Sequence, residues 1–228
     1  MDKIGIISDI HGNHKALEKA LDILKEEHVN KIFVCGDIVG YGKYPNECCE
    51  KIRALNCEVV AGNHDWAVAG LTEYEDSHSA NAIKGIEYAK TVIAPQNLSW
   101  LKGLPLYHRE DETEFVHASL LDPEGWGYLT LGSVFQGSAY KDVRETFQKM
   151  KGQICFVGHS HIPTIFLEKE HNKIKMIEPS KPSYELRNKR AVIDVGSIGK
   201  PRTNSKKATL VIYERKTQKL TFKRFSIR

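Results

Sequence analysis

The first 61 residues alternate between short apolar runs and amphipathic stretches, and this alternation limits the possible folds more than any other feature. The apolar runs are rich in β-branched residues, and the stretches between them carry apolar residues at helical spacing. In chain order they predict a strand at Ile4 to Ser8, a helix at Lys15 to Glu27, a strand at Lys31 to Cys35, a helix from Pro45 to Leu55 and a strand from Glu58 to Ala61. We therefore expect right-handed βαβ units and a mainly parallel sheet, with functional loops at the carboxyl ends of its strands.

The rest of the chain changes character. Residues from Leu71 to Leu104 are predicted to be helical, as an insertion that covers one edge of the site. The second half is richer in strands, with one helix near Asp142 to Met150 and a terminal hairpin across Arg215 to Lys219. The other strands are expected at Leu106 to Arg109, Glu114 to His117, Ile154 to Val157, Thr164 to Glu168 and Ala191 to Val195. We expect two β-rich layers within one domain, residues 1–228.

Composition and charge are those of an ordinary globular protein. Hydrophobic residues make up 41% of the chain and charged residues 27%, which argues against disordered and fibrous classes. A formal net charge of +4 over 228 residues does not require a nucleic-acid or membrane partner. The five cysteines are odd in number and lack CxxC spacing, and no signal segment or membrane-length apolar run is apparent, so we expect a cytoplasmic protein.

Metal-ligand residue types follow five of the predicted strands. Each motif alone is typical of a turn, because Asn and Asp tolerate left-handed backbone and cap their own loops. Five strand ends with the same residue types indicate one shared site instead. The ligand-capable residues are Asp9, His11, Asp37, Asn63, His64, Asp65, His117, His159 and His161. Glycines that permit a positive φ or a close backbone approach stand beside them at Gly12, Gly36, Gly62 and Gly158.

The chemistry of this ligand set favours an open catalytic site. It combines nitrogen and oxygen donors without thiolate, which suits Mn, Fe, Co, Ni or Zn and disfavours a closed cysteine-zinc module. The ligands are too many for one ion. Two ions about 3.5 to 4 Å apart with a bridging carboxylate would accommodate them, and such a pair clamps both oxygens of a phosphoryl displacement.

The motif order resembles that of the calcineurin-like metallophosphoesterases. Their signature is D-x-H, then GD, then GNHD, then a lone H, then GHSH, and here these are Asp9 to His11, Gly36-Asp37, Gly62 to Asp65, His117 and Gly158 to His161. The chain looks most like their small prokaryotic phosphodiesterase branch, which includes diadenosine tetraphosphatase-like members. The resemblance extends from Ile4 to about Arg202 and includes Gly36 to Gly42, Tyr44 to Glu47 and Gly196 to Arg202.

The resemblance and the strand count together imply an α/β fold, a four-layer αββα sandwich of two mixed β-sheets flanked by helices. The implied ligands are Asp9, His11 and His161 for one ion, Asn63, His117 and His159 for the other, and Asp37 as the bridge. His64 then lies beside the leaving-group oxygen, and Asp65 orients its ring. One departure is Ala118, where this branch commonly has glycine, and we expect it to affect substrate specificity rather than metal binding.

The implied function is that of a dinuclear-metal phosphodiesterase, with manganese as the favoured metal. Both ions would lower the pKa of a bridging water, and the hydroxide would attack phosphorus in a small phosphodiester or phosphoanhydride. His64 would act as general acid toward the leaving oxygen. Asn13 and Arg202 are candidates for binding phosphate oxygens; alternatively, Asn13 is a helix N-cap and Arg202 belongs to a solvated basic loop.

Two other functions compete with this one. Related metallophosphoesterases cut nucleic acids with the same site, but the chain lacks a long basic stripe with interleaved aromatic residues, so nucleic acid is at most a substrate. Some relatives are non-catalytic interaction scaffolds. Such scaffolds typically lose ligands, whereas every expected ligand and His64 are present here. The expected partner is therefore a small phosphorylated substrate.

Overall fold

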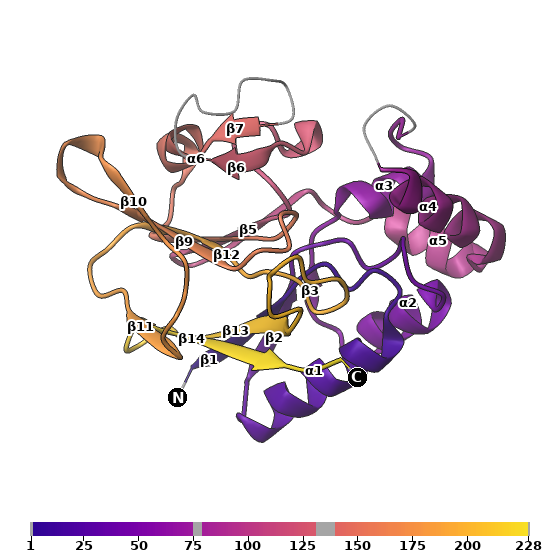
Figure 1. Ribbon diagram of the computed structural model, residues 1–228, viewed down its shortest axis with the longest axis horizontal. Coiled ribbons are helices and arrows are strands. Elements are labelled where there is room, and N and C mark those ends of the chain that lie inside the picture. Colours follow the sequence, from indigo (N-terminus) through magenta and orange to yellow (C-terminus); the bar gives the residue numbers. More distant parts are fainter. Residues whose placement is uncertain (1, 75–78, 131–139, 228) are drawn as a thin grey trace.

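The computed structural model describes residues 2–74, 79–130 and 140–227, and within them the strands form two six-stranded sheets (Figure 1). The first sheet contains, in spatial order, β11 (Ser183–Glu185), β14 (Lys219–Phe225), β13 (Ala208–Glu214), β1 (Lys3–Ile7), β2 (Lys31–Val34) and β3 (Glu58–Val59). The second contains β10 (Ile174–Ile177), β9 (Thr164–Glu168), β12 (Ala191–Asp194), β8 (Ile154–Val157), β5 (Thr113–Val116) and β4 (Tyr107–Glu110). A short parallel pair, β6 (Tyr128–Thr130) and β7 (Tyr140–Asp142), lies outside both sheets.

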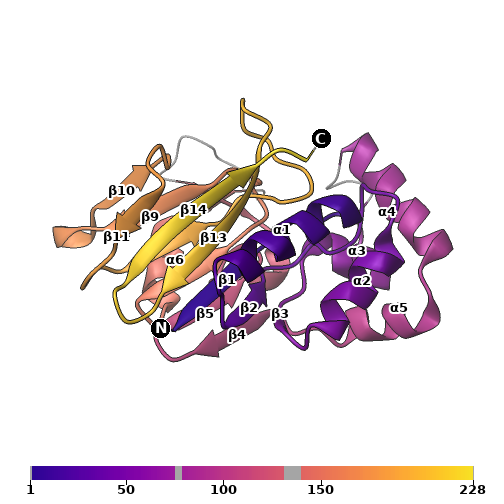
Figure 2. The ribbon, with the colours of Figure 1, turned by 90° about the horizontal axis from the view of Figure 1, so that it is seen from below.

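Helices lie on the outer faces of this pair of sheets and at one end of it (Figures 1 and 2). They are α1 (His14–Glu26), α2 (Pro45–Ala54), α3 (Asn63–Ala69), α4 (Ala80–Val92), α5 (Pro95–Lys102) and α6 (Val143–Lys149), with 3-10 turns at Pro123–Gly125 and Glu170–Asn172. Figures 1 and 2 show α1 beside the first sheet and α2 to α5 gathered at its β3 end. Helix α6 packs on the other sheet, where Val143 and Phe147 join a cluster with Val157 of β8.

Three apolar clusters separate the layers and confirm the αββα sandwich. On β1, Ile4 and Ile6 face the core between the sheets, whereas Ile7 belongs to the cluster under the helices. Residue Gly5 leaves room for Leu24 of α1, because a Cβ there would lie 2.6 Å from the Leu24 side chain. The side-chain period of two thus directs successive residues of one strand into different layers.

Both sheets are mixed. Strands β1, β2 and β3 run parallel to one another, as do β12, β8 and β5, while the remaining neighbours are antiparallel. The expectation of a mainly parallel sheet therefore holds only for the first three strands, because the terminal hairpin of β13 and β14 adds antiparallel to β1. The parallel strands direct their carboxyl ends toward one edge of the sandwich, and the candidate site lies there.

The other differences from the sequence-based expectations are local. The segment from Leu71 to Leu104 contains two helices, α4 and α5, which are separated just before Pro95 because proline begins a helix more readily than it continues one. Residues 75–78 of that segment lie outside the described residues. Helix α3 and strands β6, β7, β10 and β11 were not predicted, whereas the terminal hairpin is confirmed and is longer than expected. No helix among the described residues has the length and apolar character needed to cross a membrane.

An aromatic stack joins the two sheets. The rings of Phe33 on β2 and Phe115 on β5 lie parallel, with centroids 3.9 Å apart, and Phe156 on β8 stacks on Phe115 at 5.5 Å. All three side chains are almost completely buried. Stacked aromatic side chains in a core contribute strongly to stability, because each buries a large apolar surface.

Replacing Phe115 with alanine should therefore lower the free energy of unfolding by about 3 to 5 kcal/mol, through lost burial and the cavity left behind. Urea denaturation followed by circular dichroism measures the loss. Met176→Ala is the matched control, since Met176 is 57% exposed on β10 and its truncation should change stability by no more than about 0.5 kcal/mol. Equal losses in the two variants would contradict the assignment of this stack to the core.

Candidate metal centre

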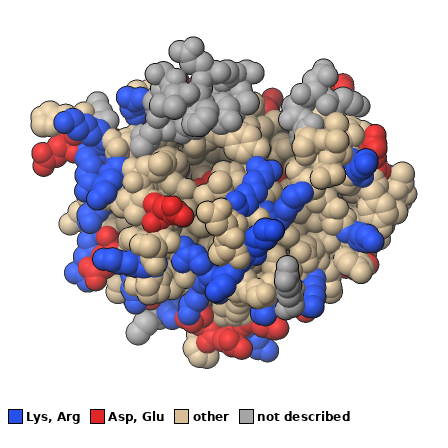
Figure 3. Space-filling view, in the orientation of Figure 1, with Lys and Arg blue, Asp and Glu red and all other residues tan. Residues whose placement is uncertain are grey.

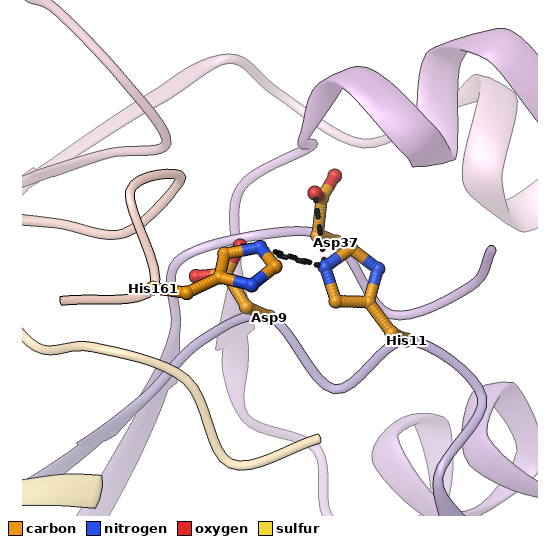
Figure 4. A group of neighbouring side chains, drawn as sticks. All are labelled: Asp9, His11, Asp37 and His161. Atoms are coloured by element: carbon orange, nitrogen blue, oxygen red, sulfur yellow. Dashed lines mark hydrogen bonds and ion pairs between the residues drawn. The ribbon is translucent and has the colours of Figure 1, made fainter. Parts of the chain in front are cut away.

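The loops after β1, β2, β3, β5 and β8 converge at the carboxyl edge of the two sheets. They bring together all seven expected ligands in two groups. Asp37 belongs to the first group and also faces the second. In the first group (Figure 4), one ligand atom from each of Asp9, His11, Asp37 and His161 lies within 4.8 Å of the others. In the second group, Asn63 Oδ1 lies 3.1 Å from His117 Nε2 and 3.0 Å from His159 Nδ1. Residues distant in the sequence thus form one buried polar cluster.

The carboxylate of Asp37 stands between the two groups. Its Oδ2 lies 3.6 Å from His11 Nε2 in the first group and 3.4 Å from His117 Nε2 in the second. Its Oδ1 accepts a hydrogen bond of 2.9 Å from the backbone N–H of His64, at the start of α3. The backbone therefore fixes one oxygen and leaves the other facing both groups, which is the geometry that a bridging ligand requires.

Asp9 is held in the same way. Its Oδ2 accepts a hydrogen bond from the backbone N–H of His159 at 3.1 Å, while its Oδ1 makes no hydrogen bond within the described residues and lies 3.1 Å from His161 Nε2. A buried carboxylate oxygen without a hydrogen bond is unusual, because desolvation of such an atom is costly. A cation at this position would compensate the cost.

Hydrogen bonds to backbone carbonyls fix the tautomers of three histidines. A carbonyl oxygen only accepts, so a ring nitrogen that contacts it carries the proton and the opposite nitrogen presents a lone pair. The contacts run from Nδ1 of His11 to Val39 O (3.2 Å), from Nδ1 of His161 to Lys200 O (2.6 Å) and from Nδ1 of His117 to Cys35 O (2.6 Å). In its neutral form each of the three histidines therefore presents an Nε2 lone pair to the cluster, as metal-ligating histidines do.

These lone pairs face one another at short distances. The Nε2 atoms of His11 and His161 are 3.0 Å apart, and Nε2 of His117 faces the side-chain oxygen of Asn63 at 3.1 Å. Two lone pairs at such distances repel unless a proton or a metal ion lies between them. The residues therefore fit two divalent ions with nitrogen and oxygen ligands, in the two groups expected from the sequence.

Charge within the cluster leads to the same conclusion. Burial alone would raise the pKa of Asp37, but the neighbouring His117 and His64 outweigh it and hold this pKa well below its usual range. Burial would lower the pKa of His117, yet the charge of Asp37 raises it to about 10. Burial, with the charge of His117, lowers the pKa of His159 to about 3 and keeps that ring neutral. A pocket that favours a proton on a buried imidazole also favours a metal ion, which displaces the proton on binding.

The backbone of the ligand loops is left-handed at five ligand positions. Positive φ values occur at Asp9 (55°), His11 (51°), Asp37 (56°), His159 (68°) and His161 (62°). Non-glycine residues rarely adopt this conformation, and it concentrates at functional sites, where the surrounding structure maintains it. The left-handed turns direct the side chains back into the space between the loops.

Two glycines allow the loops to approach each other. A Cβ at Gly62 would lie 2.2 Å from Asp37 Oδ1, and a Cβ at Gly158 would lie 1.9 Å from Ser8 Oγ. Neither glycine has a positive φ, in contrast to Gly36 at +83°. The expectation that glycine beside the ligands serves close approach is thus borne out at these two positions.

Asn63, His64 and Asp65 form the first turn of α3 rather than an irregular loop. The carboxylate of Asp65 accepts hydrogen bonds of 2.8 to 3.2 Å from four backbone N–H groups, those of Asp37, Ile38, Val39 and Gly62. None of these bonds involves the His64 ring, which Asp65 was expected to orient. The contacts give Asp65 a structural role, because they fix the loop that carries Asp37, and its orientation of the His64 ring remains a prediction.

The two candidate phosphate ligands already have partners in the protein. Asn13 caps α1, since its Oδ1 accepts from Ala16 N at 3.2 Å, and its amide nitrogen donates to Gly199 O at 3.0 Å. The N-cap alternative is therefore observed for Asn13. Arg202 lies next to the site, where its backbone N–H donates to His161 O and its guanidinium donates to the Tyr128 hydroxyl at 3.1 Å. Its binding to phosphate remains a prediction.

Sequence reasoning missed two aromatic residues of the site. The ring of Tyr41 lies 4.7 Å from that of His11 and 4.8 Å from that of His64. The ring of Tyr128 stacks on His159 at 4.3 Å. Tyr41 lies within the stretch that carries the family resemblance, so its position after Gly40 was a usable signal, whereas no pattern marked Tyr128. Ala118, the departure from the family pattern, is buried directly after His117.

Comparison with known proteins agrees with this geometry. Residues 2–218 match the model of the calcineurin-like phosphoesterase superfamily domain. The chain belongs to this superfamily. Relatives of the chain are named phosphodiesterase and bis(5'-nucleosyl)-tetraphosphatase, which are hydrolases of phosphoric esters, and the chain belongs to that class of enzyme.

Individual relatives extend the comparison. The chain is 39% identical over 221 residues to the uncharacterized protein MJ0912 of Methanocaldococcus jannaschii, and the match covers 95% of this chain and 84% of that protein. It is 26% identical over 149 residues to a symmetrical bis(5'-nucleosyl)-tetraphosphatase of Psychromonas ingrahamii, covering 60% of this chain and 52% of the relative. The crystal structure of a metallophosphoesterase from Sphaerobacter thermophilus covers 100% of this chain and 89% of its own, with 30% identity and a TM-score of 0.80.

Replacing Asp37 with alanine should weaken divalent-ion binding at both ligand groups, because its Oδ2 faces both of them. After reconstitution with Mn²⁺ and desalting, wild-type protein should retain about two ions per chain, and the variant fewer than about one. Plasma emission spectrometry measures the content. Asp111→Ala is the control, since the Asp111 side chain is 77% exposed, and unchanged metal content in Asp37→Ala would contradict the bridging geometry.

Proposed function

We propose that this protein is a dinuclear-metal-dependent phosphodiesterase that hydrolyses a small phosphodiester or phosphoanhydride, with manganese as the favoured metal. The observation that carries the proposal is the position of Asp37 Oδ2, which faces His11 in one ligand group and His117 in the other. Asp9, His11 and His161 would hold one ion, Asn63, His117 and His159 the other, and Asp37 both.

When bound, the two ions would supply a water of lowered pKa and charge stabilisation for an in-line displacement at phosphorus. In that reaction the water oxygen forms a bond to phosphorus while the bond from phosphorus to the leaving oxygen breaks. The leaving oxygen keeps the electron pair and takes a proton, and the water releases its proton to the solvent. No covalent bond between enzyme and substrate is required.

His64 is the proposed proton donor. Its side chain is only 3% exposed, and its ring packs at 4.7 Å from that of His11, so it borders the first ligand group without belonging to either group. Position Gly40 matters for this placement, because a Cβ there would lie 2.3 Å from His64 Nδ1. The Asp65 carboxylate accepts hydrogen bonds from the backbone of Asp37 and Ile38, and so fixes the loop that lies beside His64.

The named relatives favour diesters and anhydrides as substrates. Several are called symmetrical bis(5'-nucleosyl)-tetraphosphatases, and a further one, Phosphodiesterase MJ0936 of Methanocaldococcus jannaschii, is 32% identical over 84 residues. The matches cover only about half of these proteins, so their substrates enter here as part of the proposal. Both names describe cleavage of a phosphorus–oxygen bond in a substituted phosphate.

A substrate panel on Mn²⁺-reconstituted protein tests the proposal. Aryl phosphodiesters and dinucleoside polyphosphates should be hydrolysed faster than aryl phosphomonoesters. Cyclic nucleotides and single-stranded DNA and RNA complete the panel, and preferential cleavage of DNA or RNA would favour a nuclease instead. Failure to hydrolyse any phosphoric ester, with both ions bound, would overturn the proposed function.

Replacing His64 with alanine should lower kcat by roughly 10²- to 10⁴-fold, the usual contribution of a positioned general acid. The metal content should remain that of the wild type, because His64 is not among the ligands. Steady-state kinetics and plasma emission spectrometry on the same samples separate the two effects. His171→Ala, at an exposed histidine outside the site, is the control, and full turnover in His64→Ala would remove this residue from the mechanism.

A further inference from the structure

Helix α4, in the segment 71–104, carries a buried glycine in its interior. Gly85 is the sixth residue of this helix, at a position where alanine would be intrinsically more favourable. It contacts the loop of residues 37–44, which we call the Tyr41 loop. A Cβ at Gly85 would lie 2.3 Å from the backbone nitrogen of Tyr41 and 2.4 Å from its Cα. The helix and the loop therefore touch backbone to backbone, and glycine permits this approach because it has no side chain.

The contact with this region continues along one face of α4. The Tyr88 hydroxyl donates to the Lys43 carbonyl at 3.1 Å, and the Val92 carbonyl accepts from the side-chain amide of Asn46 at 2.8 Å. Asn46 is the second residue of α2, directly after the Tyr41 loop. Spacings of three and four residues place Gly85, Tyr88 and Val92 on the same side of the helix. Helix α4 is therefore fastened to the Tyr41 loop and to the start of α2.

The Tyr41 loop in turn lies against His64. The ring of Tyr41 is 4.8 Å from that of His64, with the planes tilted by 36°, and a Cβ at Gly40 would lie 2.3 Å from His64 Nδ1. Both loop residues have positive φ values, 90° at Gly40 and 32° at Tyr41. A displacement of this part of the backbone would therefore move the surface against which the His64 ring packs.

Helix α4 also packs on the helix that carries His64. Ile86 and Ala89 of α4 belong to the same buried apolar cluster as Val68 of α3, and Figures 1 and 2 both show the two helices side by side. In the space-filling view, lysine and arginine side chains gather beside a hollow in the middle of the face, and the helices α3 to α5 lie to the right of them (Figure 3). Helix α4 thus borders the site from one side and reaches His64 through both the Tyr41 loop and α3.

We propose that α4 positions the His64 ring, and that Gly85 is the residue that seats the helix on the Tyr41 loop. This inference rests on the proposed function, in which His64 gives a proton to the leaving oxygen, and it assigns a role to the segment 71–104. With alanine at position 85, the two backbones would have to separate by about 1 Å to reach the 3.4 Å of ordinary van der Waals contact. A misplacement of that size is enough to weaken a catalytic group strongly.

The kinetic test of Gly85→Ala uses two substrates whose leaving phenols differ in acidity. Phenolate is a poor leaving group and depends on a proton donor, whereas 2,4-dinitrophenolate leaves without one. With Mn²⁺ content equal to that of the wild type, the variant should lose roughly tenfold to hundredfold in kcat on methyl phenyl phosphate. On methyl 2,4-dinitrophenyl phosphate the loss should be at least about fivefold smaller. Equal losses on the two substrates would overturn the proposal.

The matched control is Gly103→Ala, at the end of α5 in the same segment. A Cβ there would lie 3.6 Å from the Trp100 carbonyl oxygen, an ordinary contact. This variant should keep the kcat of the wild type on both substrates.

A double-variant cycle asks whether Gly85 acts through His64. In a His64→Ala background, Gly85→Ala should lower kcat on methyl phenyl phosphate by less than about twofold, since the group that it positions is gone. Fully additive losses would contradict the proposal. If circular dichroism shows that Gly85→Ala does not fold, Tyr88→Phe replaces it in both experiments, because it removes only the hydroxyl that donates to the Lys43 carbonyl. Its expected loss on methyl phenyl phosphate is roughly twofold to tenfold, with the same leaving-group dependence.

A spectroscopic test does not depend on turnover. In Zn²⁺-loaded protein, which is diamagnetic, the NMR signals of the His64 ring protons are assigned by their loss in His64→Ala. Their positions report on the Tyr41 ring, because an aromatic ring shifts the resonances of protons close to it. Gly85→Ala should move these signals, and Gly103→Ala should leave them in place. Unmoved His64 signals in Gly85→Ala would count against the positioning role.

The kinetic and spectroscopic results separate this inference from the function on which it rests. Movement of the His64 signals in a protein that hydrolyses no phosphoric ester would support the positioning role and overturn the proposed function. Hydrolysis of both diesters, with equal losses in Gly85→Ala and unmoved His64 signals, would overturn the positioning role and leave the proposed function in place.

Discussion

The buried negative charge of Asp9 and Asp37 is the constraint on which the rest of the site depends. Both carboxylates are almost inaccessible to solvent, and each accepts a backbone N–H on one oxygen and turns the other oxygen toward imidazole rings. Burying such groups without compensation costs several kcal/mol or more. Protons on the surrounding imidazoles, or divalent cations held among them, would compensate this charge.

The sandwich provides the rigidity that this arrangement needs. Five ligand residues lie in the left-handed region of φ, which costs on the order of 1 to 3 kcal/mol for each non-glycine residue. The conformation is maintained because the parallel strands end in the same layer and because Asp65 fastens the backbone at Asp37, Ile38 and Val39. Side-chain packing between the sheets includes the Phe33 and Phe115 stack. This packing holds the strand ends of one sheet in a fixed position relative to those of the other.

Several parts of the fold and the site were predictable because they follow from local patterns. The periodicity of the first 61 residues predicted β1, α1, β2 and α2 closely, and the strand-end motifs pointed to seven residues that the structure brings together. Helix α3 was not predicted, because Asn63, His64 and Asp65 are typical of loops, whereas in the structure the Asp65 carboxylate accepts from the Gly62 N–H at the start of the helix. The four backbone partners of Asp65 were not foreseen either, because three of them come from another loop.

The sequence by itself determined which chemical groups are available and which of them directly follow a strand, because side-chain identity and periodicity are properties of the chain. Only the tertiary structure decided which groups meet. The placement of Asp37 between His11 and His117 and the packing of Tyr41 on His64 both join residues far apart in the chain. Such contacts depend on the register of two packed sheets, and long-range packing rather than local conformational preference determines that register.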